Sequence, residues 1–364
     1  MLATQLIPRW PEKPLYLVKR CILLGAALVI GAAPTAASDW GVGAANSHLT
    51  HPQVFAPVST PARDIETLAW FTIAVCAGIA LIVGGLLAYS IVRFRARPDD
   101  DGREPPQVYG SNPIEFAWTV VPLLIVFVLI LTTARTIYTV QAAPRPPTAL
   151  SVRVIGHQWW WEIRYPDLDI VTANEMHVPV SDPAHPAPTF LELESADVAH
   201  SFWVPQLAGK TDLIPNRKNV MWIDPHTPGT YLGQCAEFCG TEHGLMLLRV
   251  IVQPRAQWED WVASQRRPAA RDGAAGHGRE IFESTACVNC HTVRGTVADG
   301  RFGPDLTHIM SRDTLGAGAA MNTPDNLKTW IKDPNLIKPG VLMPAMNLND
   351  AELADVAQYL ETLR

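Results

Sequence analysis

The sequence predicts a multidomain membrane protein: a two-helix transmembrane hairpin, then an all-β sandwich, then an all-α domain. Three observations predict this class. Two long uncharged apolar runs precede residue 135, apolar residues alternate in short segments over residues 148–253, and a Cys-x-x-Cys-His sequence lies near position 290. A length of 364 residues suits two or three folded units. Apolar residues make up 48% of the chain, which excludes a disordered protein.

The charge balance argues against nucleic-acid binding. The net charge is −6, and no cluster of Lys and Arg interleaved with aromatic residues could follow a phosphate backbone. We therefore expect no nucleic acid among the partners of this chain, whereas its long apolar runs make membrane lipid an expected partner.

The N-terminus has the pattern of a secretory signal peptide over residues 1–37. Lys19 and Arg20 precede a short apolar run, and small residues follow it, so we expect cleavage after Ala37. The alternative is a retained third membrane helix, but the apolar run is too short to span a bilayer comfortably.

Residues 68–92 and 116–134 contain no charged side chain, and each is long enough to cross about 30 Å of hydrocarbon as a helix. We expect helices over about 66–92 and 115–137, in a hairpin segment of residues 38–140. The connecting loop is basic, which places it in the cytoplasm, and its arginines are Arg93, Arg95, Arg97 and Arg103. Everything after the second helix then lies outside the cytoplasm.

The rest of the chain divides into two expected domains. Residues 147–254 carry short apolar strands separated by Pro and Gly, which predicts a β sandwich. Residues 255–275 are typical of a linker that contains a short helical piece, and residues 276–364 form the last domain.

Soft ligands gather near the end of the predicted sandwich. Cys235, Cys239, His243 and Met246 lie within twelve residues, and thiolate, thioether and imidazole together favour copper over hard cations. Two thiolates four residues apart could bridge two copper ions, and His200 is the candidate for a second imidazole. The alternatives are a disulfide for the cysteines and ordinary core roles for His200 and Met246. The joint spacing favours a metal site.

Here the chain resembles subunit II of the haem–copper cytochrome oxidases over about residues 55–255. The matching segments are Asp197-Val-Ala-His-Ser-Phe-Trp-Val-Pro, Cys235-Ala-Glu-Phe-Cys-Gly-Thr-Glu-His-Gly-Leu-Met, Gly156-His-Gln-Trp-Trp-Trp-Glu and Trp118-Thr-Val-Val-Pro. The resemblance implies a cupredoxin sandwich that holds a dinuclear copper centre, CuA.

The same resemblance implies individual roles. Cys235 and Cys239 would bridge the coppers, His200 and His243 would bind one each, and Met246 would be a weak axial ligand. A further ligand would be the backbone carbonyl of Glu237, and the side chain of that residue would touch a magnesium site shared with subunit I. Electrons would enter CuA at Trp159, and Glu115 matches a carboxylate at the mouth of a proton-uptake path.

Cys287-Val-Asn-Cys290-His291 is the attachment signal of a c-type haem. Two thiols one helical turn apart reach the two vinyl groups of one porphyrin edge, and the adjacent His lies under the iron. A thioredoxin-like disulfide would need a βαβ context, and a zinc site would need a second pair of ligands. We therefore expect one covalent haem bound by Cys287 and Cys290, with His291 as an axial ligand.

Residues 276–364 resemble a class I cytochrome c. The resemblance implies that the Pro304 carbonyl orients His291 and that a methionine is the sixth ligand: Met343, with Met346 as the alternative. Asn349 begins a capping box to a terminal helix that carries apolar residues at helical spacing. His277 and His308 are expected to be plain surface residues.

No residue set in the chain is typical of a nucleophile, general base or oxyanion hole, so we expect no catalytic residue here. The chain would relay electrons from cytochrome c or a bc-type complex to oxidase subunits I and III, in a bacterial-type inner membrane. Subunit I would reduce O2 to water with proton pumping. Two alternatives stay open at this point: an electron-transfer subunit of a nitric oxide reductase, and a copper-delivery or thiol-oxidoreductase module.

Overall fold

The computed structural model describes most of the chain. The described residues are 53–96, 104, 107, 109–142, 145–146, 149–182, 186–269 and 276–364. The expected signal peptide and its cleavage site after Ala37 lie outside these residues, as do Arg97 and Arg103.

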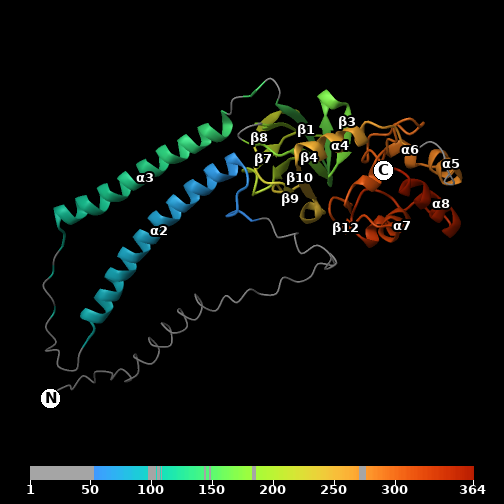
Figure 1. Cartoon of the computed structure of the whole chain (residues 1–364). Helices are drawn as coiled ribbons and strands as arrows, with labels where there is room; N and C mark the ends of the chain where they lie inside the picture. The colour runs from blue at the N-terminus through green and yellow to red at the C-terminus, as the bar shows by residue number, and fades with distance from the viewer. Residues whose placement is uncertain are drawn as a thin grey trace, which may run out of the picture. The chain divides into compact units, whose positions relative to one another are not determined.

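Two long apolar helices open the described part of the chain. They are α2, Thr60–Arg93, and α3, Asn112–Gln141, each with a proline in its first turn, where the missing N–H leaves no helix bond unmade. Both exceed the length that crosses a bilayer core, and Figure 1 shows both as long continuous helices. Pro122 lies inside α3.

Two five-stranded sheets follow, ordered β3-β2-β1-β5-β8 and β4-β10-β9-β6-β7. We call them the sandwich domain (Figure 1). The strands of the first sheet are β1 Leu150–His157, β2 Trp160–Tyr165, β3 Ile170–Ala173, β5 Thr189–Ser195 and β8 Asn219–Ile223. Those of the second sheet are β4 Glu175–Pro179, β6 His200–Trp203, β7 Thr211–Leu213, β9 Gly229–Cys235 and β10 Leu247–Gln253.

The sandwich core follows from strand alternation. Val152 and Val154 on β1 are buried while their neighbours are partly exposed, and β5 runs parallel to β1 with Leu191 and Leu193 buried in register. Trp161 on β2 is fully buried between the sheets and lies edge-on to Phe202, with ring centroids 6.0 Å apart.

Hydrogen bonds connect the membrane helices to the sandwich domain. Thr60, the first residue of α2, donates its hydroxyl to Asp224 Oδ2 across 2.7 Å. At the other end of the hairpin, Trp222 Nε1 on β8 donates to the Val140 carbonyl in the last turn of α3 across 2.6 Å. The start of α2 and the end of α3, the two open ends of the hairpin, therefore both contact the sandwich domain.

The segment predicted as a linker contains a helix, α4, Arg255–Gln265. Trp261 on this helix stacks on the buried His177 ring at a centroid distance of 4.3 Å and packs edge-on against Tyr165. The first half of the segment is therefore part of the sandwich core rather than free chain.

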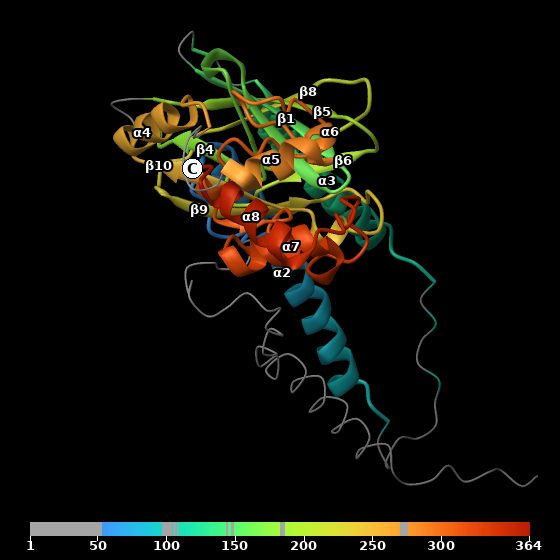
Figure 2. The same cartoon turned by 90° about the vertical axis from the view of Figure 1, so that its right-hand side faces the viewer.

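The C-terminal domain, residues 276–364, is built from short helices around one core (Figure 2). The helices are α5 Gly276–Ser284, α6 Cys287–Cys290, α7 Pro324–Lys332 and α8 Asp350–Glu361, and a small hairpin joins β11 Thr314–Leu315 to β12 Ala320–Met321. Helices α5 and α8 cross closely, and Phe282 contacts Tyr359.

The capping box predicted at the start of α8 is confirmed. The Asn349 side chain accepts the N–H groups of Ala351 and Glu352, and the Glu352 carboxylate accepts the Asn349 N–H. The apolar residues predicted for this helix are all buried: Leu353, Val356, Tyr359 and Leu360 within α8, and Leu363 just after its end.

Candidate copper and haem sites

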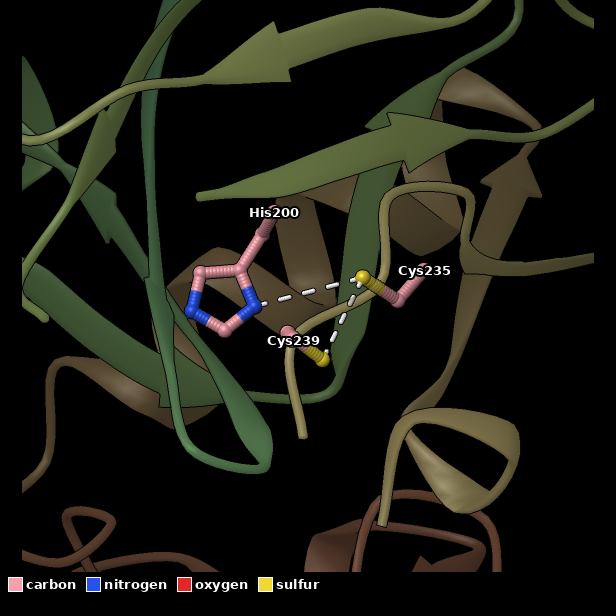
Figure 3. Close-up of side chains that lie close together, drawn as sticks. All are labelled: His200, Cys235 and Cys239. Atoms are coloured by element: carbon pink, nitrogen blue, oxygen red, sulfur yellow. Dashed lines mark hydrogen bonds between the residues drawn. The ribbon is translucent and has the colours of Figure 1, made fainter. Parts of the chain in front are cut away.

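Two thiols and an imidazole meet inside the sandwich domain (Figure 3). Cys235 Sγ lies 3.7 Å from Cys239 Sγ and 3.9 Å from His200 Nδ1. All three residues are buried, at 3% exposed or less. Because a disulfide bond is about 2.05 Å long, the two cysteines are free thiols.

The second sheet brings these residues together although they lie far apart in sequence. Strand β6 pairs with β9 so that Phe202 faces Cys235, which places His200, two residues along β6, near the end of β9. The loop between β9 and β10 then folds back, because the Cys235 N–H donates to the Met246 carbonyl across 3.0 Å.

The other three expected donors converge on the same point. His243 Nδ1 lies 3.6 Å from Cys239 Sγ, and Met246 Sδ lies 3.8 Å from that sulfur. The carbonyl oxygen of Glu237 lies 3.2 Å from Cys235 Sγ. The structure thus brings all six donors of the sequence-predicted set together around the two buried sulfurs.

Asp197 orients the His200 ring from the side that faces away from the thiols. Its Nε2 donates to Asp197 Oδ1 across 2.8 Å, and Asp197 Oδ2 accepts the Gln158 N–H. This contact leaves Nδ1 aimed at the thiols, as a carboxylate behind a metal-binding histidine does. Gly156 leaves room for the ring, since a Cβ there would lie 2.7 Å from His200 Cδ2.

The two thiols differ in acidity. Burial opposes ionisation of Cys235, but hydrogen bonds from His200 and from the Ser201 and Glu237 backbone outweigh it and lower the pKa of Cys235. Burial and the neighbouring Cys235 charge raise the pKa of Cys239. The second thiol therefore ionises most easily when a cation offsets both charges.

These donors fit a copper pair. Two buried sulfurs stand close enough to share metal ions, each has an imidazole Nδ1 beside it, and thioether and carbonyl groups complete the shell. Zinc would gain little from the thioether.

Trp159 lies in the turn between β1 and β2, directly against this cluster. Its indole Nε1 donates to the Cys239 carbonyl across 3.0 Å, and Gln158 Nε2 donates to the same oxygen across 2.8 Å. Trp159 is only 8% exposed. One hydrogen bond therefore links its ring to the backbone of a candidate copper ligand.

Two expected carboxylate roles lie on exposed side chains. The Glu237 side chain is exposed, as is its neighbour Phe238. Glu115, in the first turn of α3, is exposed and accepts the Ser111 N–H across 3.2 Å. This contact stabilises the start of its own helix.

The haem-attachment residues lie on and just after helix α6. Cys287 and Cys290 bound the helix, and His291 follows it with Nδ1 donating to the Pro304 carbonyl across 2.8 Å. Burial lowers the pKa of His291, which keeps its ring neutral, as an iron ligand must be. Gly303 leaves room for the ring, because a Cβ there would lie 2.5 Å from His291 Cε1.

A cavity of about 430 Å³ opens beside these residues. Its lining includes Cys287, Cys290 and His291, and also both Met343 and Met346. The cavity is mostly apolar, which suits a porphyrin. Both candidate sixth ligands therefore border the same space.

One sequence expectation is wrong. His308 is not a surface residue: it is 3% exposed, its Nδ1 lies 2.7 Å from the Arg364 carbonyl, and its Nε2 faces the carbonyls of Gln265 and Arg267. These hydrogen bonds join Arg364 to the end of α4 and the residues that follow it. His277, in contrast, is 70% exposed, as expected.

Sequence reasoning also missed several buried charged residues, among them Lys338 and Glu175. Lys338 is 1% exposed and donates to three carbonyl groups. Glu175 is 1% exposed and accepts three hydrogen bonds from Asp313 and Thr314. Nothing in the local sequence around either residue signals burial.

Comparisons with known proteins agree with this arrangement. Family models match the cytochrome c oxidase subunit II transmembrane domain at residues 49–134, the periplasmic domain of that subunit at 150–253, and cytochrome c at 275–364.

Related proteins cover most of the chain. Cytochrome c oxidase subunit 2 of Alkalihalophilus pseudofirmus is 32% identical over 300 residues, which is 80% of this chain and 85% of the relative. The Bacillus subtilis protein of the same name is 31% identical over 76% of this chain and 82% of its own length. A solved periplasmic domain of subunit II of cytochrome oxidase from Bradyrhizobium japonicum is 29% identical, with a TM-score of 0.31 over 34% of this chain and 96% of that one.

The fold class expected from sequence is confirmed: two apolar helices, a β-sandwich periplasmic domain and a helical cytochrome c domain. The family implies copper at the sulfur cluster and haem in the last domain. The chain belongs to the cytochrome c oxidase subunit 2 family and carries a C-terminal cytochrome c domain.

Proposed function

We propose that this chain feeds electrons into a respiratory haem–copper oxidase. A donor reduces the covalent haem c, and the electron passes through dinuclear CuA to subunit I, which reduces O2 to water and pumps protons. The observation that carries the proposal is the joint presence of six convergent soft donors and an oriented Cys-x-x-Cys-His segment in one chain. The O2-reducing site then lies in another subunit.

At the copper site the protein supplies a preformed ligand shell around two buried sulfurs. The copper pair, when bound, shares one electron between two metals, which suits rapid transfer with little rearrangement. Cys235 and Cys239 would hold the copper pair through their sulfurs, His200 and His243 would each bind copper through an imidazole, and Met246 and the Glu237 carbonyl would complete the ligand set. Asp197 fixes the His200 ring, so the donors need not reorganise when charge changes.

At the haem site, Cys287 and Cys290 would form the thioether links and His291 would bind the iron. The Pro304 carbonyl fixes the tautomer and plane of its ring. We assign Met343 as the other axial ligand, because a proline follows it as in class I cytochromes c, and a thioether ligand raises the iron potential.

The remaining roles extend this proposal. Subunits I and III are the membrane partners, and cytochrome c or a bc-type complex is the donor, with both soluble domains on the periplasmic face of a bacterial inner membrane. Exposed Glu237 would share a magnesium ion with subunit I. Glu115 would stand at the mouth of a proton path. A haem tethered by its own chain is present at high effective concentration beside CuA.

Purification of the intact complex tests the proposal. We expect subunit I to co-purify, two coppers and one covalent haem per copy of this chain, and O2 uptake driven by reduced cytochrome c. Consumption of NO without O2 uptake would instead identify a nitric oxide reductase. A chain that holds haem but releases copper readily, with no partner subunit, would identify a copper-delivery module.

A further inference from the structure

We propose that Lys338 and Glu175 are positioning residues that keep the haem-bearing C-terminal domain docked on the sandwich domain. In the docked state Trp159 is covered, so a diffusing donor reaches the copper site only through the tethered haem. The inference rests on the proposed function. It adds the contacts that hold the haem domain beside the copper site and that keep a diffusing donor from reaching Trp159 directly.

The Lys338 contact joins the two domains through a buried ammonium group. Its Nζ donates to the carbonyls of Trp159 and Leu245 in the sandwich domain, across 2.8 and 2.9 Å, and to Gly316 in its own domain across 3.1 Å. An ammonium group has three N–H donors, so this set satisfies it completely. Burial lowers the pKa of Lys338 to about 8, while the nearby Glu242 carboxylate and Cys239 oppose that shift.

Glu175 makes the converse contact: here a carboxylate of the sandwich domain accepts hydrogen bonds from the C-terminal domain. This residue lies on β4 of the sandwich domain, and its Oε1 accepts the Thr314 N–H across 2.9 Å and the Thr314 hydroxyl across 2.6 Å. Its Oε2 accepts the Asp313 N–H across 2.8 Å. Arg249 on the neighbouring strand lies 3.7 Å away and offsets the charge.

Two further hydrogen bonds join the same two domains. The Leu247 N–H at the start of β10 donates to the Ala317 carbonyl across 3.1 Å. Buried Arg312 donates from Nε to the Thr172 hydroxyl across 3.3 Å. A buried charge without partners is costly, so a surface that buries Lys338, Glu175 and Arg312 with their partners supplied is built for lasting contact.

The docked surface borders the haem cavity. Gln158, Trp159, Trp160 and Asn174 of the sandwich domain line the cavity together with the attachment residues Cys287, Cys290 and His291. The Lys338 bond to the Trp159 carbonyl therefore holds one end of the cavity wall. The Trp159 indole Nε1 donates to the Cys239 carbonyl on the copper side. The indole therefore lies between the two sites and is buried from solvent.

A docked domain and a mobile domain predict different rates of haem-to-copper electron transfer. If docking is permanent, transfer from haem to copper needs no domain motion, and its rate is independent of solvent viscosity. If the domain instead swings on its linker, each transfer waits for a diffusive search, and the rate falls as viscosity rises.

The experiment uses the intact oxidase complex with both centres loaded. Rapid photoreduction of haem c is followed by optical detection of copper reduction, at several glycerol concentrations, in wild type, Lys338→Met and Glu175→Gln. Lys332→Met, an exposed lysine of the same domain, is the matched control. Haem and near-infrared spectra and both midpoint potentials are recorded for each variant, so that a change in driving force is recognised.

We expect a viscosity-independent rate in wild type and in the control. Each interface variant leaves carbonyl or amide groups unpaired in the docked state, so the transfer rate falls by about tenfold and becomes viscosity dependent. Wild-type rates in both interface variants would overturn the inference.

A measurement on the wild-type protein keeps the inference testable if the variants fail to assemble. The Asp313, Thr314 and Leu247 amides donate across the interface, so they should be protected from hydrogen exchange, and rapid exchange of all three would overturn docking. The absence of any haem-to-copper transfer in wild type would defeat the proposed function itself. Transfer that is present but viscosity dependent would defeat this inference alone.

Discussion

The indole Nε1 of Trp159 donates a hydrogen bond to the Cys239 carbonyl across 3.0 Å. This single bond connects a side chain in the wall of the haem cavity to the backbone of a proposed copper ligand. It gives Trp159 two functions that can be separated by mutation: its ring fills the space between the sites, and its N–H fixes the ligand loop.

Replacing Trp159 by Phe keeps an aromatic ring but removes the N–H donor. We expect electron transfer into the copper site to slow by about 10- to 100-fold, because a partner of a metal ligand is lost, while copper content stays unchanged. Stopped-flow reduction measures this rate. Trp258→Phe is the control, since Trp258 Nε1 has no hydrogen-bond partner among the described residues. Equal rates in the two variants would contradict the role of the bond.

Replacing Cys235 by Ser removes one of the two bridging sulfurs. We expect the near-infrared band of the mixed-valence copper pair to vanish, with the haem spectrum unchanged, because an alcohol is a poor ligand for soft copper. Metal analysis and optical spectroscopy check both points. Cys76→Ser changes an exposed cysteine of α2 and should leave the band intact. A Cys235–Cys239 disulfide in fully loaded protein would refute the copper assignment.

The sequence could predict this site because its ligands are local. Five of the six donors lie between Cys235 and Met246, so one short loop is enough to bring them together. The haem segment, Cys287–Cys290 with His291, is shorter still. The apolar runs that became α2 and α3 are equally local signals.

The features that escaped prediction depend on distant pairing. The Lys338 acceptors lie up to 179 residues away, and Glu175 meets Thr314 across 139 residues. His308 carries no burial signal in its own segment, because its partners come from the end of the chain and from the region after α4. Polar residues of this kind are usually exposed, and only tertiary contacts reverse that expectation.

The assignment of Met343 over Met346 is open to a direct comparison. Both side chains line the haem cavity, but one thioether binds the iron. We expect Met343→Ala to lower the haem reduction potential and to give a high-spin spectrum, since the sixth ligand is lost. Met346→Ala should keep the low-spin spectrum. Redox titration with optical detection decides, and the reversed result would transfer the role to Met346.

Removing the carboxylate behind His200 should weaken copper binding. Asp197 Oδ1 accepts from His200 Nε2 across 2.8 Å, and loss of such a partner costs about 10- to 100-fold in metal affinity. Asp197→Ala should therefore show that loss in a chelator competition. Asp212→Ala, at an exposed position on β7, is the control. Unchanged affinity in Asp197→Ala would show that packing alone orients the ring.

Acid stability should depend on His177. Burial lowers the pKa of His177 to about 4, although a hydrogen bond with Gln253 favours the charged form. The unfolded chain takes up this proton near pH 6.5 and the folded protein only near pH 4. Between these values the unfolded state binds more protons, so stability falls as the pH is lowered, by up to about 3 kcal/mol from this residue.

His177→Gln removes the titration, so the thermal midpoint of the detergent-solubilised protein should fall less steeply between pH 6.5 and 4 than in wild type. Other groups that titrate in this range contribute equally to both proteins, so the difference in slope isolates His177. His277→Gln changes an exposed histidine and should leave the slope as in wild type. Identical slopes in all three proteins would mean that His177 takes up its proton without breaking its stacking on Trp261.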